Sequence, residues 1–147
     1  MKRPVVVLVE DCPNDLALMN LAIAEAQLPC ETRVLTDGQQ ALEWLLRRGA
    51  HADREGEVYP ALVLLDLKLP LLSGMEVLKG LREDPLGAVT PVVVLTTSEM
   101  PSDIAQAYAF GANAYVQKPM GFPALVELVR ALKAFWLSFN VTDPRLR

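Results

Sequence analysis

Short runs of apolar residues alternate with longer amphipathic segments along the chain. The runs Pro4–Val9, Ala61–Leu65 and Pro91–Leu95 are rich in valine and leucine and too short for helices. They predict strands buried on both faces, as in the centre of a parallel sheet. Glu31–Thr36 alternates polar and apolar residues, which suits a strand nearer a sheet edge, and Asn113–Val116 predicts a fifth, short strand.

The amphipathic segments between these runs predict five helices. Each has a recognisable start or stop: Pro29 ends the first, Asp37 caps the second, which ends at Gly49, and Ser73 with Glu76 forms a capping box for the third. The expected helices are Pro13–Leu28, Gly38–Gly49, Ser73–Pro85, Pro101–Phe110 and Phe122–Phe139. Strands that alternate with helices predict an α/β, flavodoxin-like doubly wound sheet of five parallel strands in the order 2-1-3-4-5.

Polar residues gather where the predicted strands end. Glu10 and Asp11 follow the first strand, Asp66 the third, Thr96 the fourth and Lys118 the fifth. In this strand order the first and third strands flank the switch point, where ligands bind outside the carboxyl ends of the strands. We therefore expect these five side chains to converge on one crevice.

The residue types at this crevice indicate phosphoryl chemistry. Three carboxylates held close together repel one another, and a hard divalent cation with oxygen ligands relieves that cost; Mg²⁺ suits such a site. A carboxylate can also attack phosphorus and form an aspartyl phosphate. The ammonium of Lys118 and the hydroxyl of Thr96 are suited to neutralise the other phosphoryl oxygens.

Composition narrows the function classes. The 147 residues fit one domain, and 52% hydrophobic with 22% charged residues is typical of a globular protein. A net charge of -4 and a pI near 5.0 argue against a nucleic-acid surface. Two cysteines at unrelated spacing argue against a structural metal site or a disulfide framework, and the N-terminal apolar run is too short for a signal peptide or membrane span. We therefore expect a cytoplasmic protein.

Several motifs together resemble the receiver domain of two-component response regulators. They are LVED, LLDLKLPLLSGMEVL, PVVVLTTS, GANAY and QKP, in this order, and the resemblance covers about residues 4 to 135. The spacing of 30 residues from Asp66 to Thr96 and 22 from Thr96 to Lys118 fits the family pattern. Departures are Lys68, two residues after Asp66, and Leu71-Leu72 in a loop that is commonly more polar.

The resemblance implies a role for each site residue. Asp66 would accept phosphate from a histidine kinase, so the chain would be a signalling phosphoacceptor that assists its own phosphotransfer and dephosphorylation, not an enzyme. The divalent ion, Mg²⁺ or Mn²⁺, would be held by Glu10, Asp11, Asp66 and the main-chain carbonyl of Lys68. The remaining implied roles are a switch pair, Thr96 with Tyr115, and a cis peptide bond before Pro119. Lys68 and Ser98 occupy positions that tune phosphate hydrolysis in the family.

The resemblance also indicates a subfamily and an output. A loop at Ala50–Pro60, which contains the only histidine, His51, and the aromatic C-terminal helix look most similar to single-domain regulators paired with bacterial and cyanobacterial phytochromes. No DNA-binding or cyclase segment follows the receiver, so we expect output through a contact with a downstream protein. Residues 1–147 are then a single receiver domain with an extended C-terminal helix and a short tail.

Three alternatives remain beside this interpretation. An aspartyl-phosphate phosphatase needs a second acid two residues after the nucleophile, where this chain has Lys68. A flavin-binding protein needs a phosphate cradle after the first strand, where EDCPND is acidic. A receiver-like adaptor that never takes phosphate is the stronger competitor, against which the complete set of five site residues argues.

The C-terminal helix predicts a homodimer. About twelve residues from Phe122 cover the sheet, because a helix rises about 1.5 Å per residue and the strands span roughly 17–20 Å. The overhanging segment AFWLSF carries Phe135, Trp136 and Phe139 beyond that cover. Exposed, these aromatic side chains form an apolar patch that a second copy of the helix would cover. The alternative is that they fold back on their own domain.

Overall fold

The computed structural model describes residues 3–48 and 59–146. Its core is a five-stranded parallel sheet in the order β2-β1-β3-β4-β5, as the sequence predicts. The strands are β1 (Val5–Val9), β2 (Glu31–Leu35), β3 (Leu62–Leu65), β4 (Val92–Thr96) and β5 (Ala114–Gln117). β1, β3 and β4 are almost wholly buried, whereas four of the five residues of β2 are exposed at the sheet edge.

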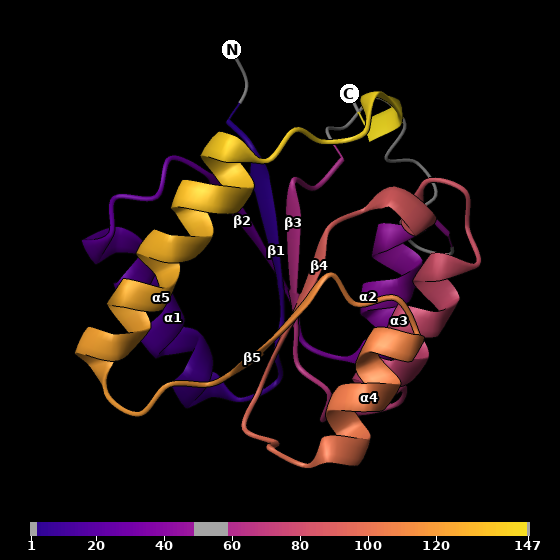
Figure 1. The fold of residues 1–147 in the computed structure, drawn as a ribbon, viewed down its shortest axis with the longest axis horizontal. Coiled ribbons are helices and arrows are strands. Elements are labelled where there is room, and N and C mark those ends of the chain that lie inside the picture. Colours follow the sequence, from indigo (N-terminus) through magenta and orange to yellow (C-terminus); the bar gives the residue numbers. More distant parts are fainter. Residues whose placement is uncertain (1–2, 49–58, 147) are drawn as a thin grey trace.

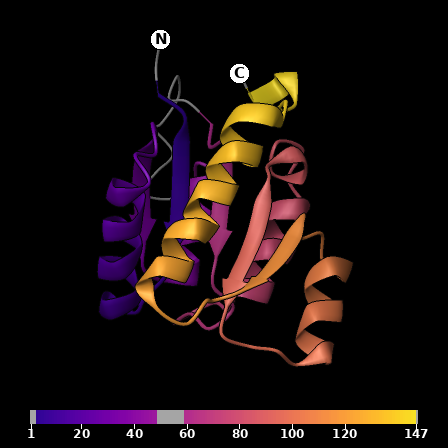
Figure 2. The same cartoon turned by 60° about the vertical axis from the view of Figure 1, so that its left-hand side comes forward.

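Helices cover both faces of the sheet, so that two separate apolar cores form (Figures 1 and 2). α1 (Pro13–Glu25) and α5 (Phe122–Ala134) pack on one face, where Leu8, Leu64 and Val129 belong to the same cluster. The other face is covered by α2 (Gly38–Leu45), α3 (Gly74–Arg82) and α4 (Pro101–Ala109). Its core includes Val63 and Val77. Strands buried on both faces explain why the central runs contain no polar residue until they end.

The helix caps largely follow the sequence signals. Asp37 accepts the N–H of Gln40, and Ser73 forms the expected capping box with Glu76. α1 ends at Glu25, three residues earlier than expected. Gln27 adopts a positive φ of 52°, and Pro29 disfavours a helical conformation at the residue before it.

The C-terminal helix extends as far as expected but changes its winding. After α5, residues Phe135–Phe139 form a π-helical segment, and a short 3₁₀ turn follows at Pro144–Leu146. The second helix, α2, ends at Leu45 and not at the predicted Gly49, and Arg47 beyond it adopts a positive φ of 56°. Gly49 itself and residues 50–58 of the predicted loop, with His51, lie outside the described residues. Within the described ranges, no helix is both long and apolar enough to cross a membrane.

Arg82 makes hydrogen bonds at the end of the sheet where the parallel strands begin. Its guanidinium donates to the carbonyls of Gly87, Thr90 and Gly111 at 2.6–2.9 Å and to Asn113 Oδ1 at 3.0 Å. These acceptors belong to the segments that lead into β4 and β5. One side chain therefore joins the end of α3 to the start of two strands.

Replacing this arginine tests that role. We expect Arg82→Met to lower the free energy of unfolding by about 2–4 kcal/mol, because several partly buried carbonyls lose a charged donor. Urea denaturation measures the change. Lys79→Met, an exposed position on the same helix, is the matched control and should change it by less than about 0.5 kcal/mol. Equal effects of the two variants would contradict the assignment.

Candidate active site at the carboxyl edge of the sheet

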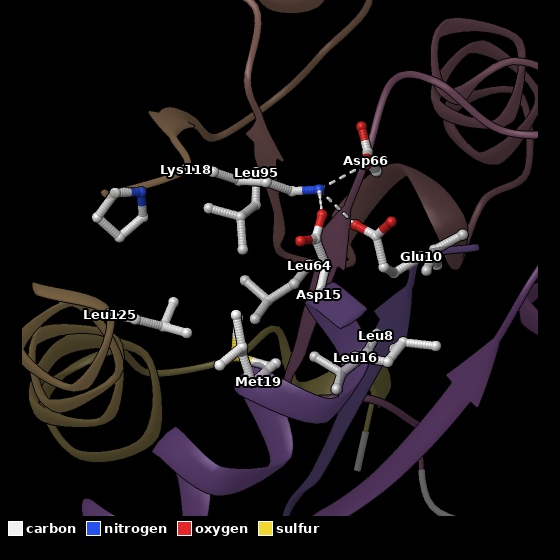
Figure 3. A pocket seen from close by; sticks show the side chains of 13 residues that line it. Leu8, Glu10, Asp15, Leu16, Met19, Leu64, Asp66, Leu95, Lys118 and Leu125 are labelled. Atoms are coloured by element: carbon white, nitrogen blue, oxygen red, sulfur yellow. Dashed lines mark hydrogen bonds and ion pairs between the residues drawn. The ribbon is translucent and has the colours of Figure 1, made fainter. Parts of the chain in front are cut away.

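The ammonium group of Lys118 is the centre of the site (Figure 3). It lies 2.6 Å from Glu10 Oε2, 2.8 Å from Asp66 Oδ2 and 2.8 Å from Asp15 Oδ2. Lys118 follows β5, whereas Glu10 and Asp66 follow β1 and β3, so the strand order brings residues from distant parts of the chain together. The sequence predicts this meeting for Lys118, Glu10 and Asp66.

Backbone groups orient the two strand-end carboxylates. Glu10 Oε1 accepts the N–H of Cys12 at 3.0 Å, and Asp66 Oδ1 accepts the N–H of Lys68 at 3.1 Å. Each carboxylate thus has one oxygen bound to its own loop and the other to Lys118. Both side chains are largely buried, at 11% and 9% exposed.

Burial and charge act on these groups in opposite directions. Burial raises the pKa of Glu10 to about 7, although Lys118 partly offsets it and Asp66 adds to it. Burial also raises the pKa of Asp66, but hydrogen bonds from Lys118, Glu10 and the Lys68 N–H outweigh this and hold it below its usual range. Burial lowers the pKa of Lys118, and the three carboxylates outweigh burial and raise it. Asp66 and Lys118 are therefore charged at neutral pH.

Asp15 is a site residue that sequence reasoning missed. It lies in the first turn of α1, where an acidic residue is expected simply for its favourable interaction with the helix dipole. It follows Asp11 by four residues, but Asp11 precedes the helix, so this spacing by itself does not mark Asp15 as a site residue. By contrast, Asp11 is exposed and has no hydrogen-bond or ion-pair partner among the residues that the structure describes.

The expected switch residues lie on the two neighbouring strands β4 and β5. Thr96 is fully buried, and its Oγ1 accepts only a long hydrogen bond, 3.4 Å, from the N–H of Ser98. The hydroxyl of Tyr115 donates to the carbonyl of Ser98 at 3.0 Å, and Ser98 Oγ donates to Asp103 at 2.6 Å. The loop after β4 is therefore tied both to β5 and to α4.

The predicted cis bond before Pro119 is wrong. The described residues contain no cis peptide bond, so Lys118 and Pro119 are joined in the trans form. Trans is favoured by about 0.5–1 kcal/mol even before proline. The long side chain of Lys118 reaches the carboxylates from a trans backbone, so the site needs no cis bond to form.

The oxygen donors fit a hard divalent cation, but no cage of side chains is preassembled. Within residues 3–48 and 59–146, no three His, Cys, Asp or Glu side chains are grouped so that they alone could hold a metal ion. Lys118 lies among the carboxylates instead. Magnesium-type sites use one or two carboxylates and keep several waters, which agrees with this arrangement.

An apolar cavity adjoins the charged cluster. It has a volume of about 80 Å³ and is lined by apolar side chains of β1, β3 and α1, among them Leu8, Leu64 and Met19 (Figure 3). Glu10, Asp15, Asp66 and Lys118 line the same cavity, so the charged cluster borders an apolar wall.

Comparisons with known proteins agree on the kind of domain. A family model described as the response regulator receiver domain matches residues 6–130. Response regulator Rcp1 of Synechocystis sp. is 35% identical over 140 residues, which cover 95% of this chain and 92% of Rcp1.

Solved structures extend that similarity to the fold. The phosphorylated cyanobacterial phytochrome response regulator RcpA is 34% identical with a TM-score of 0.87, covering 97% of this chain and 99% of that one. The Mn²⁺-bound form of Rcp1 is 33% identical with a TM-score of 0.83, covering 95% and 99%.

Proposed function

This chain belongs to the response regulator receiver domain family, and on that premise we propose that Asp66 accepts a phosphoryl group from a sensor histidine kinase. The observation that carries the proposal is the ion pair between Asp66 Oδ2 and the Lys118 ammonium, 2.8 Å apart at the carboxyl end of the central strand β3. Receiver domains typically signal and do not catalyse; we propose the same for this chain.

The proposed transfer follows from the charge states at the site. An Asp66 oxygen attacks phosphorus and forms an O–P bond, while the bond from phosphorus to the imidazole nitrogen of the kinase histidine breaks and its electron pair stays on that nitrogen. Despite burial, the pKa of Asp66 is held low by Lys118, which keeps this carboxylate ionised, the form that can attack phosphorus. Lys118 offsets the negative charge of the phosphoryl oxygens, and the Thr96 hydroxyl supplies a second donor.

A divalent cation completes the proposed site. Mg²⁺ or Mn²⁺ would be held by Glu10, Asp11, Asp66 and the Lys68 carbonyl, with water as the remaining ligands. The cation would neutralise further negative charge on the phosphoryl oxygens. A relative with a Mn²⁺-bound structure supports this assignment.

We propose that phosphorylation changes a partner-binding surface through Thr96 and Tyr115. The buried Thr96 hydroxyl would turn toward the phosphoryl group and shift the loop after β4, to which Tyr115 is bound through Ser98. The surface of α4, β5 and α5 would change with it. The downstream partner is then a protein that contacts this surface.

The kinase is proposed to be of the phytochrome type, in the cytoplasm. Similarity to RcpA and Rcp1 supports the pairing, and the two free cysteines, Cys12 and Cys30, agree with a reducing compartment. The proposal includes no nucleic acid and no membrane as partners. A phosphorylation-independent adaptor role is disfavoured because the ionised Asp66 and Lys118 pair is fully formed.

A homodimer through the C-terminal segment is part of the proposal. Phe135 and Phe139 are 50% and 79% exposed, and Val141 beyond them is 78% exposed. Trp136 packs partly against the core between α1 and α5, so the interface would rest on the two phenylalanines. This end of α5 is opposite the carboxyl edge of the sheet (Figure 1), so a second copy there leaves Asp66 accessible.

The phosphoacceptor assignment is tested with acetyl phosphate as a small donor. We expect one phosphoryl group per wild-type chain in the presence of Mg²⁺, measured by intact mass, and none with EDTA. Asp66→Asn should take none, because an amide does not attack phosphorus. Labelling that survives this substitution would overturn the assignment.

The switch is tested with Thr96→Ala. The variant should still be phosphorylated because Lys118 remains to neutralise the phosphoryl oxygens, but α4 and β5 should no longer respond. Amide NMR shifts of Tyr115 and its neighbours, recorded before and after phosphorylation, measure the response. Shift changes identical to those of wild type would refute the coupling.

The dimer is tested by sedimentation at micromolar concentration. Wild type should be dimeric, and Phe135→Glu with Phe139→Glu should be monomeric, because burying two carboxylates in an apolar interface is unfavourable. Tyr108→Glu, at an exposed aromatic position on α4, is the matched control and should remain dimeric. A monomeric wild type, or a dimeric double variant, excludes this interface.

A further inference from the structure

Lys118 has as many carboxylate partners as it has N–H donors. An ammonium carries three donors and no acceptor, and Glu10, Asp15 and Asp66 each lie within 2.8 Å of Nζ. Two of these partners belong to the strand ends that form the core of the site. The third, Asp15, comes from α1 and has no part in the chemistry proposed above.

The three partners differ in what phosphorylation does to them. Asp66 is the proposed acceptor, so its hydrogen bond to Lys118 is the one that a phosphoryl oxygen would take over. Glu10 and Asp15 do not react, and their hydrogen bonds to Lys118 can persist through the transfer. Figure 3 shows the three carboxylates arranged around the end of the Lys118 side chain.

We propose that Asp15 is a positioning residue that, together with Glu10, holds the Lys118 ammonium so that its third N–H points at Asp66 and at the phosphoryl group arriving there. The inference rests on the proposed function of Asp66. A single anchor leaves the ammonium free to rotate about its last bond, whereas two anchors fix the direction of the third donor. Donors held in place before the reaction stabilise transition-state charge without reorganising.

The position of Asp15 supports this role. Its side chain is 39% exposed, whereas that of Lys118 is 16% exposed, so Asp15 closes the site from the solvent side. Lys118 has a long, flexible side chain, so ordering it costs rotamer entropy. The hydrogen bond from Lys118 to Asp15 offsets part of this entropy cost before the phosphodonor binds.

Two variants separate positioning from general charge effects. Asp15→Asn removes the charge, and the double variant Asn14→Asp with Asp15→Asn moves the carboxylate to the neighbouring exposed position. The double variant keeps the net charge of the chain and an acidic residue in the first turn of α1, but takes the carboxylate away from Lys118. Glu25→Gln, at the far end of the same helix, is the control.

Three measurements are made on each variant. The ¹⁵N–¹H signal of the Lys118 ammonium in the metal-free, unphosphorylated protein reports how firmly the group is held. Titration with Mg²⁺ alone reports metal affinity. The rate of labelling by acetyl phosphate at saturating Mg²⁺ reports the transfer itself.

We expect both Asp15 variants to broaden or lose the ammonium signal through faster hydrogen exchange and to be labelled roughly tenfold more slowly. Their Mg²⁺ affinity should stay within about threefold of wild type, since one exposed charge near a cation is worth little at ordinary salt. Glu25→Gln should match wild type in all three measurements.

Other results would overturn the inference. A double variant that behaves as wild type would show that only the charge matters. A loss of Mg²⁺ affinity in proportion to the rate would make Asp15 a metal-site residue, and an unchanged ammonium signal would show that Asp15 does not anchor Lys118. If wild type takes no phosphate, the proposed function fails, and the ammonium signal by itself decides whether Asp15 anchors Lys118.

Discussion

The carboxyl edge of this sheet depends on one ammonium group shared by three carboxylates. Two buried acids, Glu10 and Asp66, would not both ionise side by side without a counter-charge, because burial and mutual repulsion each disfavour the charged form. Lys118 supplies that charge and leaves the acids unequal: the pKa of Glu10 is raised to about 7 and that of Asp66 is held low. The residue proposed to attack phosphorus is thus the one kept ionised.

A second partly buried cation, Arg82, lies where the strands begin, and its hydrogen-bond acceptors are uncharged. Arg82 is bound to main-chain carbonyls and an amide oxygen, which carry no net charge and do not titrate. Its role is to join α3 to the segments that precede β4 and β5. The two cations therefore have different roles. Arg82, bound to neutral acceptors, stabilises the fold, whereas Lys118, bound to carboxylates, belongs to the proposed reactive site.

The proposed phosphoryl-transfer site and the proposed dimer surface lie at opposite ends of the strands. The charged cluster and the loop after β4 lie at the carboxyl edge, where strand ends meet the N-termini of α1 and α4. The exposed aromatic side chains Phe135 and Phe139 lie at the far end of α5. α5 begins after β5 at the carboxyl edge, runs to the opposite edge and packs on α1, so it connects the two regions.

The sequence by itself determined the order of strands and helices, the caps at Asp37 and Ser73, and the meeting of Glu10, Asp66 and Lys118. Those features depend on local periodicity and on the rule that parallel strands end at one edge. Only the tertiary structure decided that Asp15 joins the cluster, that Asp11 stays in solvent and that Trp136 turns toward the core. Which side chain reaches an ammonium or fills a gap depends on helix orientation and packing in three dimensions, and residue spacing along the chain does not contain that information.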